Sequence, residues 1–277
     1  MARLRSDTGL LPTAVRVAVA CGFLVLSMSA CAGATDDWEG IQARGSLRVG
    51  MDASFPPFEA VAADGSLMGL DVDLARELGR RLGLEIEFVA NLPYDGLYDA
   101  LAVGRVDVLI SSLVVNPDRT DSVSYSTPYF DAGQVLVVGE ASPPITGMAD
   151  LGGRTLAVEF GSRGDEAARS WAGQLDGLTL LPCQTAAEAL DLVAAARADA
   201  ALVDHVSALA AGARRAPPEQ GGPLTIVGAP VVEEPYAVAV RARNRALLRA
   251  VNRALGDMKA DGTLDALIAR WVAGEGQ

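Results

Sequence analysis

The chain has 277 residues, of which half are apolar and about a fifth are charged, and its formal net charge is −12. This composition excludes a disordered chain, because it supplies enough apolar surface to build a core. The negative charge argues against a nucleic-acid-binding surface, which needs clustered basic residues. The length suits one large domain or two smaller ones.

The first thirty residues have the pattern of an export signal. Arg3, Arg5 and Arg16 precede a short apolar stretch, residues 17–30, that ends in small residues. That stretch is shorter than the roughly 20 residues that a membrane-spanning helix needs, so we expect residues 1–30 to be a signal peptide. Removing its three arginines and one aspartate takes away a net +2 and leaves the exported part with a formal charge of −14.

Cys31 follows two small residues, Ser29 and Ala30, and this arrangement resembles the bacterial lipobox. In a lipobox the cysteine is lipidated and becomes the new N-terminus, so we expect an acyl lipid such as palmitate on Cys31. Residues 31–39 would then form a short tether. The alternative is a plain secretory signal in which Cys31 has no such role. No later segment is long and apolar enough to cross a bilayer.

Cysteine and histidine are too few for a disulfide framework or a zinc site. Cys21 lies in the expected signal, which leaves Cys183 as the one unmodified thiol of the exported chain. With a single histidine, His205, we expect no zinc site of cysteine and histidine ligands. Nothing around His205 resembles the nucleophile elbow of a Ser-His-Asp triad. We therefore expect no metal and no cofactor.

The exported chain opens with alternating strands and helices. Apolar residues at helical spacing, with Gly83 at the end, predict a helix over residues 71–82. Short apolar or alternating runs predict strands at 47–51, 84–89 and 106–110, and a second helix is predicted at 94–103. This β-α-β-α-β order indicates a mostly parallel sheet covered by helices.

After a strand predicted at residues 134–139, the same order of elements begins again. Further strands are predicted at 155–160, 178–181, 200–203, 225–227 and 236–240. Further helices are predicted at 163–172, 185–196, 206–213, 244–259 and 264–273, with a surface loop at 214–223. Two such α/β units suggest two lobes with a cleft between them.

Several polar side chains follow the predicted strands directly. In open α/β sheets, ligands bind outside the carboxyl ends of the strands, so these residues are candidates for a binding site. They are Asp52, Ser111, Ser112, Ser162 and Asp204, and Arg119 follows Ser112 by seven residues. The set offers hydroxyls, a cation and two carboxylates, but no nucleophile beside a base and no metal-binding cluster. Such a set suits the binding of a zwitterion.

Five segments carry a family resemblance. They are residues 50–59, 69–74, 107–119, 126–130 and the closing 261–264 with Trp271. In order and spacing they resemble the bacterial extracellular solute-binding proteins of family 3, the receptors of polar amino-acid ABC importers. Residues 69–74, for example, are similar to that family's G-F-D-x-D-L segment. Each piece is weak by itself, and the ordered set is specific.

The resemblance implies an α/β fold of the type II periplasmic-binding-protein (Venus-flytrap) class, in which two Rossmann-like lobes are joined by two hinge strands. Lobe 1 would hold residues 40–138 plus 232–277, and lobe 2 would hold residues 139–231. The implied function is closure of the lobes on a polar amino acid or a related small zwitterion, not catalysis.

The family also implies partners and a location. ABC permease subunits in the membrane would read the closed receptor, which would be an exported monomer without a nucleic-acid partner. Lipid on Cys31 would hold it at the outer face of the cell membrane or in the periplasm.

Matching positions give roles for the backbone of the ligand. Arg119 matches the arginine that pairs with the α-carboxylate, and a guanidinium offers two parallel donors for that purpose. Asp204 matches the acid that receives the α-ammonium. Ser111, Ser112 and the Leu113 backbone would bracket the ligand, and Ser162 would face its carboxylate beside helix-start N–H groups. The alternatives are a surface ion pair of Arg119 with Asp118 or Asp121, and helix capping by Asp204 and the serines.

Other positions would recognise the ligand side chain. Asp52 matches a contact position, with Phe55 and Tyr94 as walls, unless these two rings pack in the core. An acid between aromatic walls favours a ligand with N–H donors, such as glutamine, histidine, arginine or lysine. Arg163, if it points inward, would instead allow an acidic ligand. The family pattern is broken at Asn116 and Val114, where relatives have threonine and a hydroxyl.

The alternative function is that of an enzyme on the same fold. Periplasmic cyclohexadienyl dehydratases, which act on prephenate-like acids, resemble these receptors. Such an enzyme needs a general acid in the cleft. Glu159 lies near the right strand end, although its neighbour Phe160 could equally be the inward residue.

Overall fold

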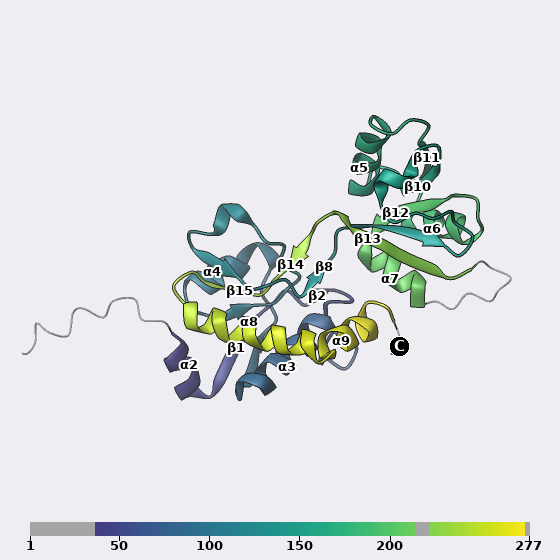
Figure 1. Cartoon of the computed structure of the whole chain (residues 1–277). Helices are drawn as coiled ribbons and strands as arrows, with labels where there is room; N and C mark the ends of the chain where they lie inside the picture. The colour runs from purple at the N-terminus through teal and green to yellow at the C-terminus, as the bar shows by residue number, and fades with distance from the viewer. Residues whose placement is uncertain (1–36, 214–221, 275–277) are drawn as a thin grey trace, which may run out of the picture. The chain divides into compact units, whose positions relative to one another are not determined.

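The computed structural model describes residues 37–213 and 222–274. The expected signal peptide, Cys31, most of the tether and most of the loop at 214–223 therefore lie outside the described residues. No helix in the described part of the chain is long and apolar enough to cross a membrane. The fold is a mixed α/β fold of two lobes, each built on its own five-stranded sheet (Figure 1).

The first sheet has the strand order β5-β1-β6-β15-β7. β1 (Ser46–Gly50) pairs in parallel with β5 (Glu85–Val89) and with β6 (Val108–Leu109). β15 (Ala239–Arg241) runs antiparallel to β6 and to β7 (Val123–Tyr125). The lobe thus combines an N-terminal β-α-β-α-β unit with a strand from the C-terminal part of the chain.

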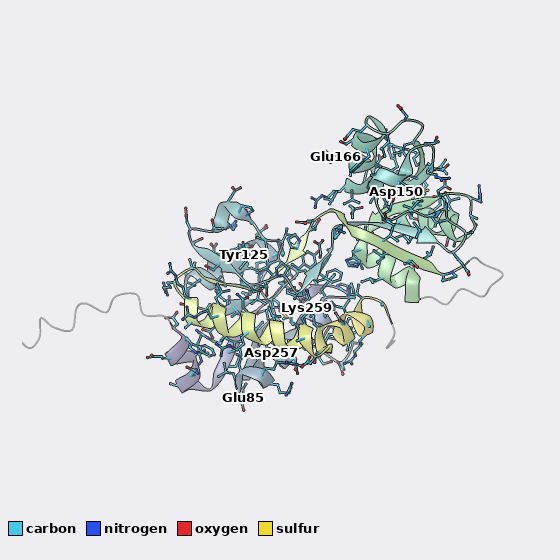
Figure 2. All side chains as sticks on the ribbon, in the orientation of Figure 1. Glu85, Tyr125, Asp150, Glu166, Asp257 and Lys259 are labelled. Carbon is cyan, nitrogen blue, oxygen red and sulfur yellow. The ribbon has the colours of Figure 1, made fainter. Side chains whose placement is uncertain are left out.

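Helices cover both faces of the first sheet (Figure 1). They are α2 (Trp38–Arg44), α3 (Leu70–Leu82), α4 (Leu97–Ala102), α8 (Arg245–Ala260) and α9 (Thr263–Trp271). Alternation along the strands divides the core: Val108 packs with the apolar faces of α3 and α8, whereas its neighbour Leu109 packs with α4. Polar residues of the same helices face solvent, as Asp257 and Lys259 on α8 do (Figure 2).

A small sheet of β2 (Ser54–Phe55), β3 (Glu59–Val61) and β4 (Leu67–Met68) leads into α3. Gly69 makes this junction possible. Its φ is 127°, and a Cβ atom at this position would lie 2.1 Å from the carbonyl oxygen of Phe58. Only glycine therefore allows β3 to run against the first turn of α3. The Asp71 amide donates a hydrogen bond of 2.8 Å to that Phe58 carbonyl, which fixes the junction.

The second sheet has the order β11-β10-β12-β9-β13. β10 (Thr155–Glu159) pairs in parallel with β11 (Thr179–Cys183) and β12 (Ala200–Asp204). β9 (Gln134–Gly139) runs antiparallel to β12 and to β13 (Leu224–Val232), which closes the other edge. Its helices are α5 (Arg163–Ala172), α6 (Ala186–Ala194) and α7 (His205–Ala213).

The two faces of the second sheet also carry separate cores. Val135 and Val137 of β9 pack with α6, while Leu136 between them belongs to the cluster on the α5 side. This arrangement is the period-2 alternation of a strand that is buried on both faces. Exposed acids stand on the outer surface, as Glu166 does on α5 (Figure 2).

The chain passes twice between the two sheets. β8 (Phe130–Asp131) pairs antiparallel with β14 (Pro235–Tyr236), and these two strands directly precede β9 and follow β13. The start of α7 lies against this pair. The Phe130 ring stacks on the His205 ring with centroids 5.2 Å apart, and His205 Nδ1 lies 2.6 Å from the Asp131 carbonyl oxygen.

Most predicted elements are present, and several differ. The helix predicted at 94–103 begins as a 3-10 turn, Tyr94–Gly96, before α4. The strand predicted at 236–240 is divided, because Ala237 donates to the Leu113 carbonyl and Val238 to the Ser126 hydroxyl as the chain leaves β14 for the first sheet. Unpredicted elements are α2, β2, β3, β4, β7, β8 and the 3-10 turns Pro117–Arg119 and Met148–Leu151.

Candidate ligand-binding site

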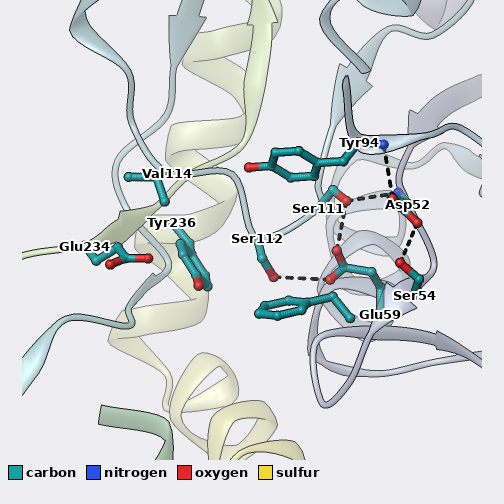
Figure 3. Close-up of a pocket in the computed structure, with 10 residues that line it drawn as sticks. Asp52, Ser54, Glu59, Tyr94, Ser111, Ser112, Val114, Glu234 and Tyr236 are labelled. Carbon is teal, nitrogen blue, oxygen red and sulfur yellow. Dashed lines mark hydrogen bonds between the residues drawn. The ribbon is translucent and has the colours of Figure 1, made fainter. Parts of the chain in front are cut away.

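A pocket of about 320 Å³ lies at the carboxyl ends of strands of the first sheet (Figure 3). Its lining residues come from four stretches of sequence: Asp52, Ser54, Phe55 and Glu59; Tyr94; Ser111, Ser112 and Val114; Glu234 and Tyr236. Three of the ten carry carboxyl groups, and none is cationic. The pocket therefore presents acids, hydroxyls and aromatic rings.

Asp52, two residues after the end of β1, is held in place by three neighbours (Figure 3). Its Oδ1 accepts a hydrogen bond of 2.7 Å from the Ser54 hydroxyl, and its Oδ2 accepts one of 3.0 Å from the Tyr94 amide. Its own amide donates to Ser111 Oγ at 3.0 Å. The carboxylate is only partly buried, so its remaining lone pairs are open to a ligand donor.

Two aromatic rings stand beside this acid. Phe55 and Tyr94 are each 50 % exposed, so neither packs in the core. Phe55 is supported from below by Phe58, whose ring is stacked at 5.7 Å and is 1 % exposed. Exposed rings on an ordered base offer apolar surface to a ligand at little cost in conformational entropy.

A second carboxyl group, Glu59, lies beneath the serine pair. Ser111 Oγ donates to Glu59 Oε1 at 2.8 Å, and Ser112 Oγ donates to Glu59 Oε2 at 3.2 Å (Figure 3). The Ser112 amide donates to Asp71 Oδ2 at 2.6 Å. Glu59 and Asp71 are 1 % and 0 % exposed, so two carboxyl groups share one buried site.

Burial sets the protonation of this pair. Desolvation raises the pKa of Glu59, and the adjacent Asp71 carboxyl raises it further. Desolvation also raises the pKa of Asp71, against the opposing effect of the Ser112 amide. Two neighbouring carboxyl groups in a dry site do not both ionise at neutral pH, because the second charge would have no counter-charge. The pair therefore retains a proton.

Arg119 lies at the end of the 3-10 turn Pro117–Arg119, which Asn116 caps by accepting from the Asp118 amide at 2.9 Å. Its guanidinium lies over the Tyr98 ring, 4.3 Å from the centroid. It makes no ion pair with Asp118 or Asp121 among the described residues. The side chain is exposed and its donors are available to an external carboxylate.

In the second lobe, the predicted residues lie at helix starts. Ser162 Oγ caps α5 by accepting from the Asp165 amide at 3.1 Å. Asp204 Oδ1 accepts from the Ser207 amide at 2.8 Å in the first turn of α7. Arg163, the first residue of α5, forms an ion pair with Glu234. Capping is thus present at Ser162 and Asp204, and it leaves each side chain with further acceptor capacity.

The pocket brings together five of the predicted residues: Asp52, Phe55, Tyr94, Ser111 and Ser112. Leu113, Arg119, Ser162, Arg163 and Asp204 are outside its lining, although Arg163 reaches a lining residue, Glu234. Leu113 is fully buried, and its carbonyl accepts the Ala237 amide. The lining also contains Ser54, Glu59, Val114, Glu234 and Tyr236, which were not predicted as site residues.

One unpredicted residue had a signal in the sequence. Asp71 shares a helix face with Leu74, Ala75 and Leu78, all of them fully buried. An acid at i, i+3, i+4 and i+7 spacing with core residues is itself a buried acid. Glu234 and Tyr236 had no local signal, because a distant segment brings them to the pocket.

Two lobes, two crossing segments and a polar pocket at strand ends are the architecture of the periplasmic-binding-protein fold. The model of the family "Bacterial extracellular solute-binding proteins, family 3" matches residues 47–274. The chain therefore belongs to this family. No cluster of metal-binding side chains occurs in the part of the chain that the structure describes.

Individual relatives are consistent with this assignment. The chain is 31 % identical over 236 residues to the L-cystine-binding protein TcyJ of Escherichia coli K12, covering 85 % of both chains. The unliganded, open L-cystine solute receptor of Neisseria gonorrhoeae matches with a TM-score of 0.71 at 29 % identity, over 85 % of this chain and 96 % of the other. An ancestral cyclohexadienyl dehydratase matches with a TM-score of 0.70 at 25 % identity, over 86 % and 97 %.

Proposed function

We propose that this protein is the extracytoplasmic receptor of an ABC importer and binds a polar amino acid or a related small zwitterion. The observation that carries the proposal is the pocket, which combines a partly buried carboxylate, a pair of oriented serines and two exposed aromatic rings. These groups can hold an ammonium or amide group and the carbon chain that bears it. Together they can bind and orient such a ligand.

The ligand carboxylate is assigned to Arg119 and the α-ammonium to Asp204. Arg119 is exposed, lies over the Tyr98 ring, and has no carboxylate partner among the described residues. Asp204 uses one oxygen to cap α7, and its other oxygen accepts no hydrogen bond from the described residues. A carboxylate can accept from a helix amide and from an ammonium at the same time. Ser112, Ser162 and the backbone of Leu113 complete the assigned set.

Lobe closure is the proposed mechanism. The lobes are taken as predicted, residues 40–138 plus 232–277 and residues 139–231, with one correction. β9 pairs within the second sheet, so residues 134–138 are assigned to the second lobe and the first hinge to residues 130–133 instead of Gly139, with the second hinge at residues 232–235. A ligand held first by one lobe would gain contacts with the second only in the closed state. That difference in contacts shifts the population toward closure. Permease subunits would then recognise the closed form, with the receptor acting as a monomer.

The protein is further proposed to be a lipoprotein, with residues 1–30 as its signal peptide, residues 31–39 as its tether and the anchor on Cys31. Radiolabelled palmitate supplied to expressing cells should be incorporated into the wild-type chain and not into Cys31→Ser. Label retained by Cys31→Ser would contradict the anchor and leave a cleaved secretory signal.

The experiment that tests the binding function is a thermal-shift screen of the exported protein against the twenty standard L-amino acids and L-cystine, followed by calorimetry. We expect at least one ligand with a polar side chain to stabilise the protein and to bind with one-to-one stoichiometry. Absence of any response would overturn the proposal.

The second candidate function is a dehydratase acting on prephenate-like acids. Two observations favour it: the structural likeness to an ancestral dehydratase, and a carboxyl group in the pocket lining, Glu59, whose pKa is raised by burial. Glu159, the other candidate acid, ends β10 and forms no side-chain hydrogen bond with the described residues. Turnover of prephenate by the purified protein would establish the enzyme, whereas amino-acid binding without turnover supports the receptor.

A further inference from the structure

Each serine hydroxyl of the pocket has only one proton, so each can donate a hydrogen bond in one direction only. Ser111 Oγ accepts the Asp52 amide and is 2.8 Å from Glu59 Oε1, so its proton points to Glu59. Ser112 Oγ is 3.2 Å from Glu59 Oε2 and 3.5 Å from Asp71 Oδ2. Its neighbours below the pocket are thus carboxyl oxygens, and its proton also points down.

The backbone at Ser112 is strained to make this arrangement. Its φ is 48°, in the left-handed region that non-glycine residues seldom adopt. That conformation directs the Ser112 amide to Asp71 Oδ2 at 2.6 Å, and an ionised carboxylate accepts an amide proton more strongly than a neutral carboxyl group does. Asp71 lies in the first turn of α3, where the helix dipole favours a negative charge. The negative charge therefore belongs on Asp71 and the proton on Glu59.

Among the residues that the structure describes, no cationic side chain pairs with either carboxyl group. The titratable groups that face the two carboxyls are Tyr129 before β8, Tyr236 on β14, Tyr94 in its 3-10 turn and Asp52 after β1. All four are acids. No ion pair of the described residues includes Glu59 or Asp71. Two buried charges without a cation would be strongly unfavourable, so one proton is retained.

We infer that Glu59 and Asp71 hold one buried proton and act as positioning residues, which turn the Ser111 and Ser112 hydroxyl protons away from the pocket so that Ser112 offers lone pairs to an N–H donor of the ligand. A protonated carboxyl oxygen keeps a lone pair, so both serines still donate while the proton is held. This inference deepens the proposed receptor function and rests on it for the identity of the ligand.

The shared proton should make the stability of the ligand-free protein depend on pH. The folded chain holds a proton that a free glutamate, with a pKa near 4.3, releases. The pair's contribution to stability is therefore fully present below that value and is lost as the pH rises toward the raised pKa of the pair. Between about pH 5 and 8, the unfolding equilibrium constant of the wild type should rise by up to about tenfold per pH unit more than that of Glu59→Gln.

The first arm measures urea unfolding at pH 5, 6, 7 and 8. Glu59→Gln should lose the proton-linked slope, and the exposed control Glu85→Gln should keep it (Figure 2). Asp71→Asn should reduce the slope, because it removes the neighbouring charge but leaves the burial that chiefly raises the pKa of Glu59. A wild type without this excess slope, or a Glu59→Gln variant that retains it, overturns the shared proton. If Glu59→Gln does not fold, Asp71→Asn decides this arm.

The second arm measures binding of L-arginine, L-histidine, L-glutamine and L-cystine by calorimetry. The side-chain amide that Glu59→Gln introduces would donate its protons to a serine oxygen and reverse that hydroxyl. This variant should therefore weaken binding at least about tenfold, and more than Asp71→Asn does. Ser112→Ala, which removes the acceptor but keeps the pair, should weaken binding and retain the wild-type pH slope.

The affinities measured in this arm test the direction of the two hydroxyl groups. Unchanged affinity in Glu59→Gln or in Ser112→Ala overturns the assigned hydroxyl direction. If the wild type binds none of the four and no other amino acid, the receptor function fails, and the first arm still decides the proton pair.

Discussion

Polar residues at the strand ends of the first lobe bond mainly to one another, whereas those of the second lobe bond to the helix that follows them. Asp52, Ser111 and Glu59 form a continuous chain of hydrogen bonds in the first lobe. Ser162 and Asp204 each accept one amide of their own helix in the second. The first lobe thus has a site assembled before any ligand arrives, and the second offers single groups on helix starts.

The two lobes also differ in the side chains that form the core beneath each site. Under the first pocket, Phe58 contacts Phe130 and Tyr236 at centroid distances of 5.4 and 5.3 Å, a cluster of large rings. The second sheet is packed with small and branched residues, Ala157 and Ala201 among them. Rigid aromatic packing fixes the positions of the residues above it. The difference suggests that the first lobe selects the ligand and the second lobe completes its enclosure.

The largest effect expected concerns the two charged anchors. Arg119→Ala and Asp204→Ala should each weaken amino-acid binding by about 30-fold or more, since removing one partner of an enclosed charge pair costs about 2–5 kcal/mol. Calorimetric titration measures the loss, and circular dichroism checks the fold. Arg105→Ala and Asp191→Ala, both on exposed residues, are the matched controls.

Each of these two substitutions also removes a contact within the protein, so its effects on stability and on affinity must be compared. Asp204→Ala also removes a helix cap, for which about 1 kcal/mol of stability is expected to be lost. If Asp204→Ala loses only that stability and retains affinity, capping is its whole role and the second lobe has no ammonium site. Retained affinity in Arg119→Ala would show that its position over Tyr98 is structural.

The fold was predictable wherever periodicity extends over several residues. The strand at 134–139 and the helix at 163–172 were predicted with the bounds that β9 and α5 have. Two-residue strands such as β2 and β4 have no period to detect, and the hydrogen bonds of distant residues define them. The division of the strand predicted at 236–240 has the same origin, because tertiary partners on two sheets compete for it.

The site residues that follow strands were predictable from the sequence, and the buried acid beneath them was not. Asp52, Ser111 and Ser112 follow strands and could be placed at a sheet edge by topology alone. Glu59 could not, since a single acid after Phe58 has the same local pattern as a surface residue. Its burial depends on Asp71 and on the close approach that Gly69 allows. Contacts between the ends of different elements are set by packing, which a one-dimensional pattern does not contain.

The smallest effect expected concerns Arg163, whose exposed ion pair with Glu234 links the start of α5 to the pocket lining. Exposed pairs contribute about 0.2–1 kcal/mol, so Arg163→Ala should leave stability nearly unchanged. Releasing Glu234 would add negative potential to a pocket that already contains Asp52. We therefore expect a cationic ligand to bind roughly two- to fivefold more tightly to Arg163→Ala.

Arg169→Ala is the matched control, because Arg169 lies on the same helix and pairs with Asp165, away from the pocket lining. Calorimetry at low and at high salt separates the two explanations of any change, since a purely electrostatic gain fades as salt screens it. A loss of affinity of about tenfold in Arg163→Ala at both salt concentrations would mean that Arg163 contacts the ligand directly. The ligand side chain would then be acidic, and Glu234 would occupy, in the free receptor, the place of the ligand carboxylate.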